Sequence, residues 1–105
     1  MPWHRIDTSD GLEPGEKRLA RIQDREVLVC RLPDPLQDQY VAIASRCTHA
    51  AWPLAGEPIE GNEILCTLHG ARFDLRDGCP TGGPASKPLA TYPVEVRDGV
   101  LYVSL

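Results

Sequence analysis

Two short segments of the chain combine a cysteine with a histidine. Cys47-Thr48-His49 and Cys66-Thr67-Leu68-His69 hold two of the three histidines in the chain, and sixteen residues separate His49 from Cys66. Two extended residues span only about 7 Å, so each segment brings its two side chains to one site. Turn-forming residues at Gly56 and Gly61-Asn62 allow the intervening piece to fold back. The pattern therefore predicts a metal centre with two thiolate and two imidazole ligands.

Two kinds of centre fit this ligand set. Zinc takes two cysteines and two histidines in a closed structural site, but its ligands are usually grouped as a cysteine pair and a histidine pair. A 2Fe–2S centre can take two cysteines on one iron and two histidines on the other. Here each segment supplies one cysteine and one histidine, which favours the binuclear centre. Ordinary surface or core histidines would explain one such pair more easily than two.

The elements that position these ligands are predicted to be β-strands. Ten prolines and nine glycines divide the chain into short pieces with little helical periodicity, which is typical of an all-β domain. Tight turns are expected at Gln23-Asp24, Asp77-Gly78 and Asp98-Gly99, because these residue types tolerate positive φ or favour turns. The expected strands are residues 3–8, 17–22, 26–32, 40–46, 63–66, 71–75, 89–97 and 100–105.

Two segments differ from ordinary sheet sequence, and both contain a predicted ligand pair. We expect one domain over residues 1–105, with cluster-binding loops at about 46–56 and 65–82. Six of the eleven residues 78–88 are Gly or Pro, which predicts a rigid loop without strands. A loop of this length in a small domain usually has a function.

Composition and charge indicate which partners and which cellular location suit such a centre. The chain is 42% hydrophobic and 25% charged, with a net charge of −4, which argues against nucleic acid or an anionic membrane as partner. No apolar stretch suggests a membrane span or a signal peptide, so we expect a cytoplasmic protein whose thiols stay reduced. Cys30 is expected to face the core, and Cys79 to be a thiol without a role at the centre.

The two ligand segments resemble the cluster-binding boxes of Rieske proteins. The likeness extends to Gly70, to Ala71-Arg72-Phe73-Asp74, to Gly78 and the Pro/Gly-rich loop that follows, and to the closing hairpin over 92–103. The resemblance implies small antiparallel sheets and one Rieske-type 2Fe–2S cluster clasped by two loops. It also implies that Cys47, His49, Cys66 and His69 are the cofactor ligands, with the two imidazole edges reaching solvent.

Within this family the chain is similar to the ferredoxins that serve bacterial ring-hydroxylating oxygenases. High-potential Rieske proteins carry a disulfide between the cluster loops, whereas the corresponding positions here are Trp52 and Leu68. Those proteins also place serine and tyrosine donors where this chain has Ala71 and Phe73. Fewer donors stabilise the reduced cluster less, so we expect a potential of about −150 mV, at the low end of the Rieske range.

The function implied is one-electron transfer rather than catalysis. A monomeric ferredoxin would take an electron from a flavin-dependent reductase and pass it to a terminal oxygenase, through transient contacts. Two alternatives remain at this point: the small Rieske-like subunit of a nitrite reductase or other multicomponent oxidoreductase, and a zinc-stabilised binding module. An oxygenase catalytic subunit would also need a mononuclear iron site, for which too few histidines remain.

Overall fold

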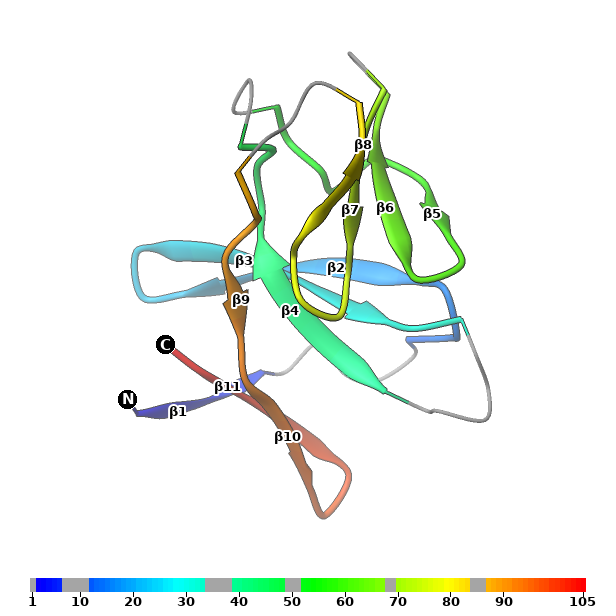
Figure 1. Cartoon of the computed structure of the whole chain (residues 1–105). Helices are drawn as coiled ribbons and strands as arrows, with labels where there is room; N and C mark the ends of the chain where they lie inside the picture. The colour runs from blue at the N-terminus through cyan, green and yellow to red at the C-terminus, as the bar shows by residue number, and fades with distance from the viewer. Residues whose placement is uncertain (1, 7–11, 34–38, 49–51, 68–69, 84–86) are drawn as a thin grey trace.

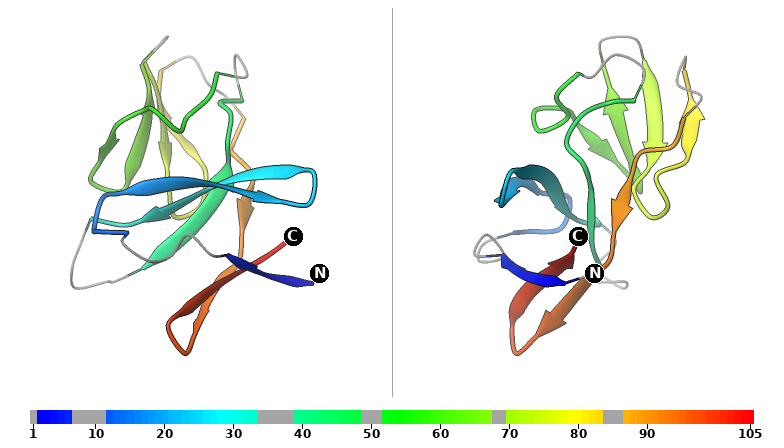
Figure 2. Two further views of the ribbon diagram at one scale, coloured as in Figure 1. Left: turned by 180° about the vertical axis from the view of Figure 1, so that it is seen from behind. Right: turned by 90° about the vertical axis from the view of Figure 1, so that its left-hand side faces the viewer.

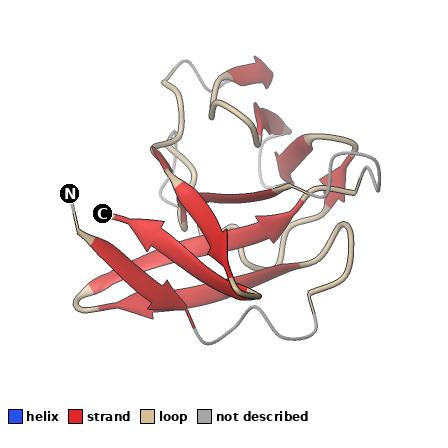
Figure 3. Cartoon of the chain, turned by 90° about the horizontal axis from the view of Figure 1, so that it is seen from below, coloured by secondary structure: helices blue, strands red, loops and turns tan. Residues whose placement is uncertain are grey.

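The computed structural model describes residues 2–6, 12–33, 39–48, 52–67, 70–83 and 87–105, and these form β-strands joined by turns and loops (Figures 1 and 3). None of these residues belongs to a helix, so the described part of the chain has no helix able to cross a membrane. The strands are β1 (Trp3–Ile6), β2 (Lys17–Ile22), β3 (Arg25–Arg31), β4 (Tyr40–Ala44), β5 (Ile59–Glu60), β6 (Glu63–Cys66), β7 (Ala71–Asp74), β8 (Pro80–Gly82), β9 (Thr91–Tyr92), β10 (Val94–Arg97) and β11 (Val100–Ser104).

The strands build three small antiparallel sheets. The strand orders are β1-β11-β10, β2-β3-β4-β9 and β5-β6-β7-β8. Figures 1 and 2 show the sheet of β2, β3, β4 and β9 in the middle, with β5–β8 at one end of the molecule and β1, β10 and β11 at the other. The expected fold class, all-β with small antiparallel sheets, is confirmed.

Strand β3 belongs to two hydrophobic cores at once. Leu28 and Cys30 pack into a core shared with β6 and β7, whereas Val27 and Val29 pack into a core shared with β1 and β11. All four side chains are fully buried, as expected for a central strand covered on both faces by alternating residues. The middle sheet therefore supports both outer sheets.

The predicted turns are present. Asp98 and Gly99 have φ values of 51° and 77° and join β10 to β11, as a two-residue hairpin turn requires. Gln23, with φ of 56°, turns β2 into β3, where Ile22 pairs with Arg25. Gly78 also has positive φ, 79°, in the turn after β7.

Most expected strands are confirmed, and two have the predicted bounds, β2 and β6. The single strand expected over 89–97 is wrong, because β9 ends at Tyr92 and β10 begins at Val94. Pro93 lies between them and has no N–H to donate to a ladder. The chain changes sheets there, since β9 pairs with β4 and β10 pairs with β11.

The strand-free loop expected over 78–88 is also wrong in part. Its residues Pro80–Gly82 form β8, which pairs with β7 across an irregular register at Arg72/Phe73. The short β5, paired with β6, was not predicted either. Both strands have only two or three residues, and β8 contains Pro and Gly, so neither carries the alternation that indicates a strand.

Candidate metal centre

The first predicted cysteine follows the end of β4. Cys47 is 2% exposed, and its backbone N–H donates to the carbonyl of Trp52 over 2.8 Å. The flanking Leu54 N–H donates to the carbonyl of Ser45 over 2.9 Å, and Arg46 pairs with Pro53 in an isolated bridge. The backbone thus closes a tight loop with the Cys47 side chain in the interior at its base.

The second predicted cysteine is the last residue of β6. Cys66 is fully buried and pairs with Ala71 of β7. Its carbonyl accepts a 2.9 Å hydrogen bond from the N–H of Gly70, whose φ of 76° lies in the region that favours glycine. A second tight turn therefore follows a buried thiol, as in the first segment.

The two thiols lie in one hydrophobic core. The cluster of buried side chains that contains Cys47 and Cys66 also includes Leu54, Ile64, Ala71, Phe73, Leu75 and Leu89. The predicted ligands His49 and His69 lie outside the described residues, so the complete four-residue ligand set stays a prediction.

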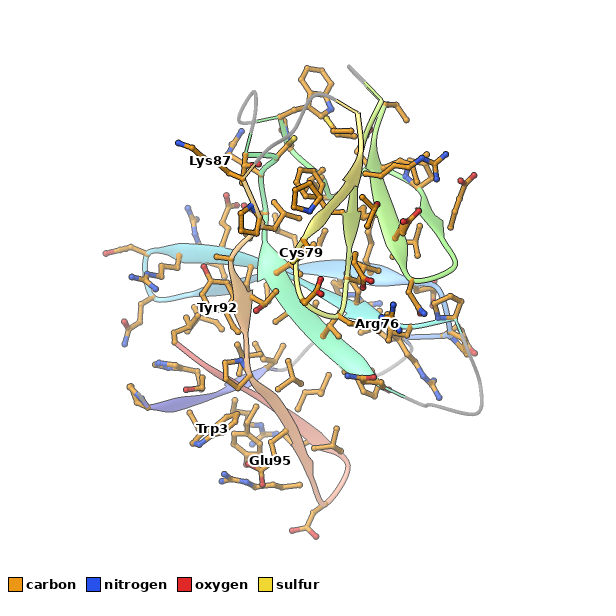
Figure 4. All side chains as sticks on the ribbon, in the orientation of Figure 1. Trp3, Arg76, Cys79, Lys87, Tyr92 and Glu95 are labelled. Atoms are coloured by element: carbon orange, nitrogen blue, oxygen red, sulfur yellow. The ribbon has the colours of Figure 1, made fainter. Side chains whose placement is uncertain are left out.

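The Pro/Gly-rich segment after β8 lies directly against the second turn. A Cβ added at Gly83 would be 2.5 Å from the carbonyl oxygen of Gly70 and 2.6 Å from the Cα of Ala71. The hydroxyl of Thr48 donates to the carbonyl of Lys87 over 2.8 Å. Lys87, labelled in Figure 4, lies on the segment that runs from this end of the molecule to β9. The Pro/Gly-rich segment is thus in contact with both ligand segments.

A buried carboxylate contacts the second ligand segment and, through Trp52, is connected to the first. Both the backbone N–H and the hydroxyl of Thr67 donate to Oε2 of Glu57, the hydroxyl over 2.7 Å. These hydrogen bonds from Thr67, together with one from the Trp52 side chain, lower the pKa of Glu57, against the opposing effect of burial. Sequence reasoning missed Glu57, because a single glutamate in a loop carries no signal of burial.

The apolar residues near the first ligand segment have different environments. Leu54 is fully buried in the core, so it serves as packing, whereas Trp52 is 41% exposed. Leu68 of the second ligand segment lies outside the described residues. Ala71 and Phe73 are fully buried and have no side-chain donors.

The remaining candidate residues are accounted for by local structure. Cys30 faces the core as predicted, and burial raises the pKa of its thiol to about 12. Cys79 is exposed. Asp74 binds Arg76, and Asp77 accepts the N–H of Cys79 over 2.9 Å in the turn predicted at Asp77-Gly78. His4 is half-buried in β1.

The residues described fit an iron–sulfur centre. Thiolates are the ligands that hold such clusters, and an apolar surrounding limits water access and tunes the potential. Two cysteines from separate tight turns meet these requirements by lying in one buried apolar cluster. The donor set and its burial therefore agree with the binuclear centre indicated by the sequence.

The chain belongs to the Rieske [2Fe-2S] domain family, whose pattern matches residues 2–93. Membership implies a Rieske-type 2Fe–2S cluster as the cofactor. Among curated proteins, the chain is 30% identical over 103 residues to "Ferredoxin CarAc" of Metapseudomonas resinovorans, covering 97% of this chain and 92% of that protein. It is 32% identical over 105 residues to the ferredoxin component of biphenyl 2,3-dioxygenase from Rhodococcus jostii (strain RHA1), covering 100% and 94%.

Two similar solved structures are also ferredoxins of a dioxygenase. The ferredoxin of carbazole 1,9a-dioxygenase from Nocardioides aromaticivorans IC177 superposes with a TM-score of 0.87 at 33% identity, covering 99% of this chain and 98% of that one. A ferredoxin bound to the oxygenase of carbazole 1,9a-dioxygenase gives a TM-score of 0.84 at 30% identity, covering 97% and 92%. These named relatives are ferredoxin components, not catalytic oxygenases.

Proposed function

We propose that this protein is a one-electron carrier, a Rieske ferredoxin that supplies a terminal aromatic-ring oxygenase. The observation that carries the proposal is the burial of Cys47 and Cys66 in one core, each beside a tight turn. Similarity along nearly the whole chain to ferredoxin components of dioxygenases supports it. The working unit would be one domain over residues 1–105, with cluster loops at about 46–56 and 65–82.

The chain's own residues would hold and adjust the cofactor. Cys47 and Cys66 would bind one iron, and His49 and His69 the other. The cluster, when bound, supplies a centre that takes up and releases one electron. No substrate bond is made or broken, so the protein has no catalytic residue of its own. Its part is to exclude water from the sulfur side and to set the potential.

The partners would be a flavin-dependent reductase and a terminal oxygenase, met in turn by a cytoplasmic monomer. The structure of a related ferredoxin bound to its oxygenase supports the second partner. Electron-transfer interfaces are typically small and short-lived, so we expect weak binding. The net charge of −4 suggests that added salt weakens it further if the partner's docking face is basic.

The alternatives from the sequence are less well supported. Membership of the Rieske family argues against a zinc-stabilised binding module. The named relatives are separate ferredoxin components of oxygenase systems, which favours the carrier over the subunit of a nitrite reductase. Obligate co-purification with a large subunit would reverse that preference.

The decisive experiment is spectroscopic and compares matched cysteine variants. The purified protein should be red-brown, contain two irons per chain, and give a low-average-g Rieske signal after reduction with dithionite. Cys66→Ser should abolish the signal, whereas Cys79→Ser should keep it, because Cys79 is exposed and outside both ligand segments. A colourless protein with one zinc per chain would refute the proposal, and a potential well above zero would refute the expected value of about −150 mV.

A further inference from the structure

Glu57 is an unusual residue for the interior of this protein. It is one of two buried polar residues in the described part of the chain, at 8% exposure, and the other is Ser104. Burying a carboxylate is unfavourable unless hydrogen-bond donors surround it. A buried carboxylate at this position therefore needs a structural or functional reason.

Glu57 contacts the second ligand segment directly and is connected to the first through Trp52. Its Oε2 accepts from the N–H and the hydroxyl of Thr67, the residue that follows Cys66. Its carboxylate also accepts from the side chain of Trp52, whose carbonyl binds the N–H of Cys47. Its own N–H donates to the carbonyl of Leu54 over 3.0 Å. One carboxylate thus binds the backbone beside Cys66 and is connected to Cys47 through Trp52.

These contacts favour the charged form of the carboxylate. Each donor points a positive hydrogen at the oxygens, and such hydrogen bonds stabilise the ionised group. Hydrogen bonds from Thr67 and Trp52 lower the pKa of Glu57 against the opposing effect of burial, and the charge of Lys17 has a smaller effect in the same direction. The interior therefore holds a negative charge next to Thr67, adjacent to a cysteine of the proposed cluster.

Two neighbouring glutamates provide a contrast. Glu60 and Glu63 both bind Arg72, at 3.4 and 3.3 Å, and their side chains are 60% and 31% exposed. Their charges are offset by a cation and screened by solvent. At 8% exposure Glu57 is less open to solvent than either of them, so solvent screens its charge less.

We propose that Glu57 is a positioning residue that connects the two cluster loops and, through its buried negative charge, makes reduction of the cluster less favourable. This inference rests on the proposed function. A negative charge in a medium of low effective dielectric opposes the arrival of an electron nearby. Glu57 would thus contribute to a low potential, together with the missing donors at Ala71 and Phe73.

The test is the reduction potential of the holoprotein in three forms: wild type, Glu57→Gln and Glu60→Gln. Both substitutions remove one negative charge, but only Glu57 is buried. Glu57→Gln should shift the reduction equilibrium at least threefold toward the reduced form, about 30 mV for a one-electron couple. Glu60→Gln should change the reduction potential by less than half as many millivolts as Glu57→Gln.

Each outcome decides the inference separately from the proposed function. A Rieske signal in all three proteins with equal potentials would overturn the role of Glu57 and leave the electron carrier intact. If Glu57→Gln does not retain the cluster, Glu57→Asp decides, since it keeps the charge. Retention of the cluster in Glu57→Asp, with a potential within a twofold shift of wild type, would support the inference, and its loss there would refute it.

Discussion

Replacing Gly83 by alanine tests whether the Pro/Gly-rich segment holds the cluster loops in place. A Cβ at this position would meet the backbone of Gly70 and Ala71 at 2.5 to 2.8 Å, and φ is +78°. Backbone atoms cannot rotate away as a side chain does, so the segment must move. Gly99 has a nearly identical φ of +77°, but a Cβ there meets nothing within 4 Å.

Both substitutions therefore place alanine in a left-handed conformation, but only Gly83→Ala also brings a Cβ too close to neighbouring backbone atoms. Alanine in a left-handed conformation costs about 1–2 kcal/mol. Overpacking adds about 1–3 kcal/mol, so Gly83→Ala should destabilise the protein by about 2–5 kcal/mol in total. Gly99→Ala should cost only the first amount. A difference of about 1 kcal/mol corresponds to at least about 4 °C in the melting temperature of a domain of this size.

The measurement is the apparent melting temperature of the holoprotein at one scan rate, with the rate of cluster loss to a chelator as a second readout. Gly83→Ala should melt at least about 4 °C below Gly99→Ala and lose its cluster faster, because the displaced segment no longer covers the second turn. Equal melting temperatures and equal rates of loss would refute the reasoning that this close approach holds the loops.

Two further predictions concern buried side chains. Burial raises the pKa of Cys30 from 9.0 to about 12, so the unfolded chain ionises this thiol first and stability is lost as pH rises above about 9. The free energy of unfolding, measured with urea at pH 8, 9 and 10, should fall more steeply with pH in wild type than in Cys30→Ala, by up to about 1.4 kcal/mol per pH unit. Equal slopes in the two proteins would contradict the raised pKa of Cys30. Ala71→Ser adds a hydrogen-bond donor at a buried position. A hydrogen bond worth about 1 kcal/mol corresponds to about 40 mV for one electron, so the potential measured by voltammetry should rise by about that amount. An unchanged potential would show that the residue at position 71 does not govern it.

The fold was predictable where strands are long enough to show alternation or are bounded by turn residues. β2 and β6 follow from their sequence, and Gln23 and Asp98 adopt the positive φ that their turns require. The failure at Pro93 has a physical reason. Alternation continues from Tyr92 to Val96 in sequence, but the hydrogen-bonding partner changes from β4 to β11, which a periodicity cannot reveal.

The candidate site was predictable to the extent that it depends on residue type and spacing. Cys47 and Cys66 stand out because each precedes a histidine, and the structure places both in one core. Glu57 and Gly83 depend on contacts between segments distant in the chain. Neither residue type nor local spacing distinguishes them from ordinary loop residues, so only the three-dimensional structure identifies them.

The position of the chain ends has a practical consequence. The N–H of Leu105 donates to the carbonyl of Pro2, and both ends lie beside the sheet of β1, β10 and β11, away from the β6–β7 turn (Figures 1 and 2). Trp3 and Glu95 mark the same end in Figure 4. A linker to an electrode or to a fused reductase at either end would thus attach opposite the ligand segments. Such a linker would immobilise the protein in a known orientation, with the proposed cluster loops directed toward solution.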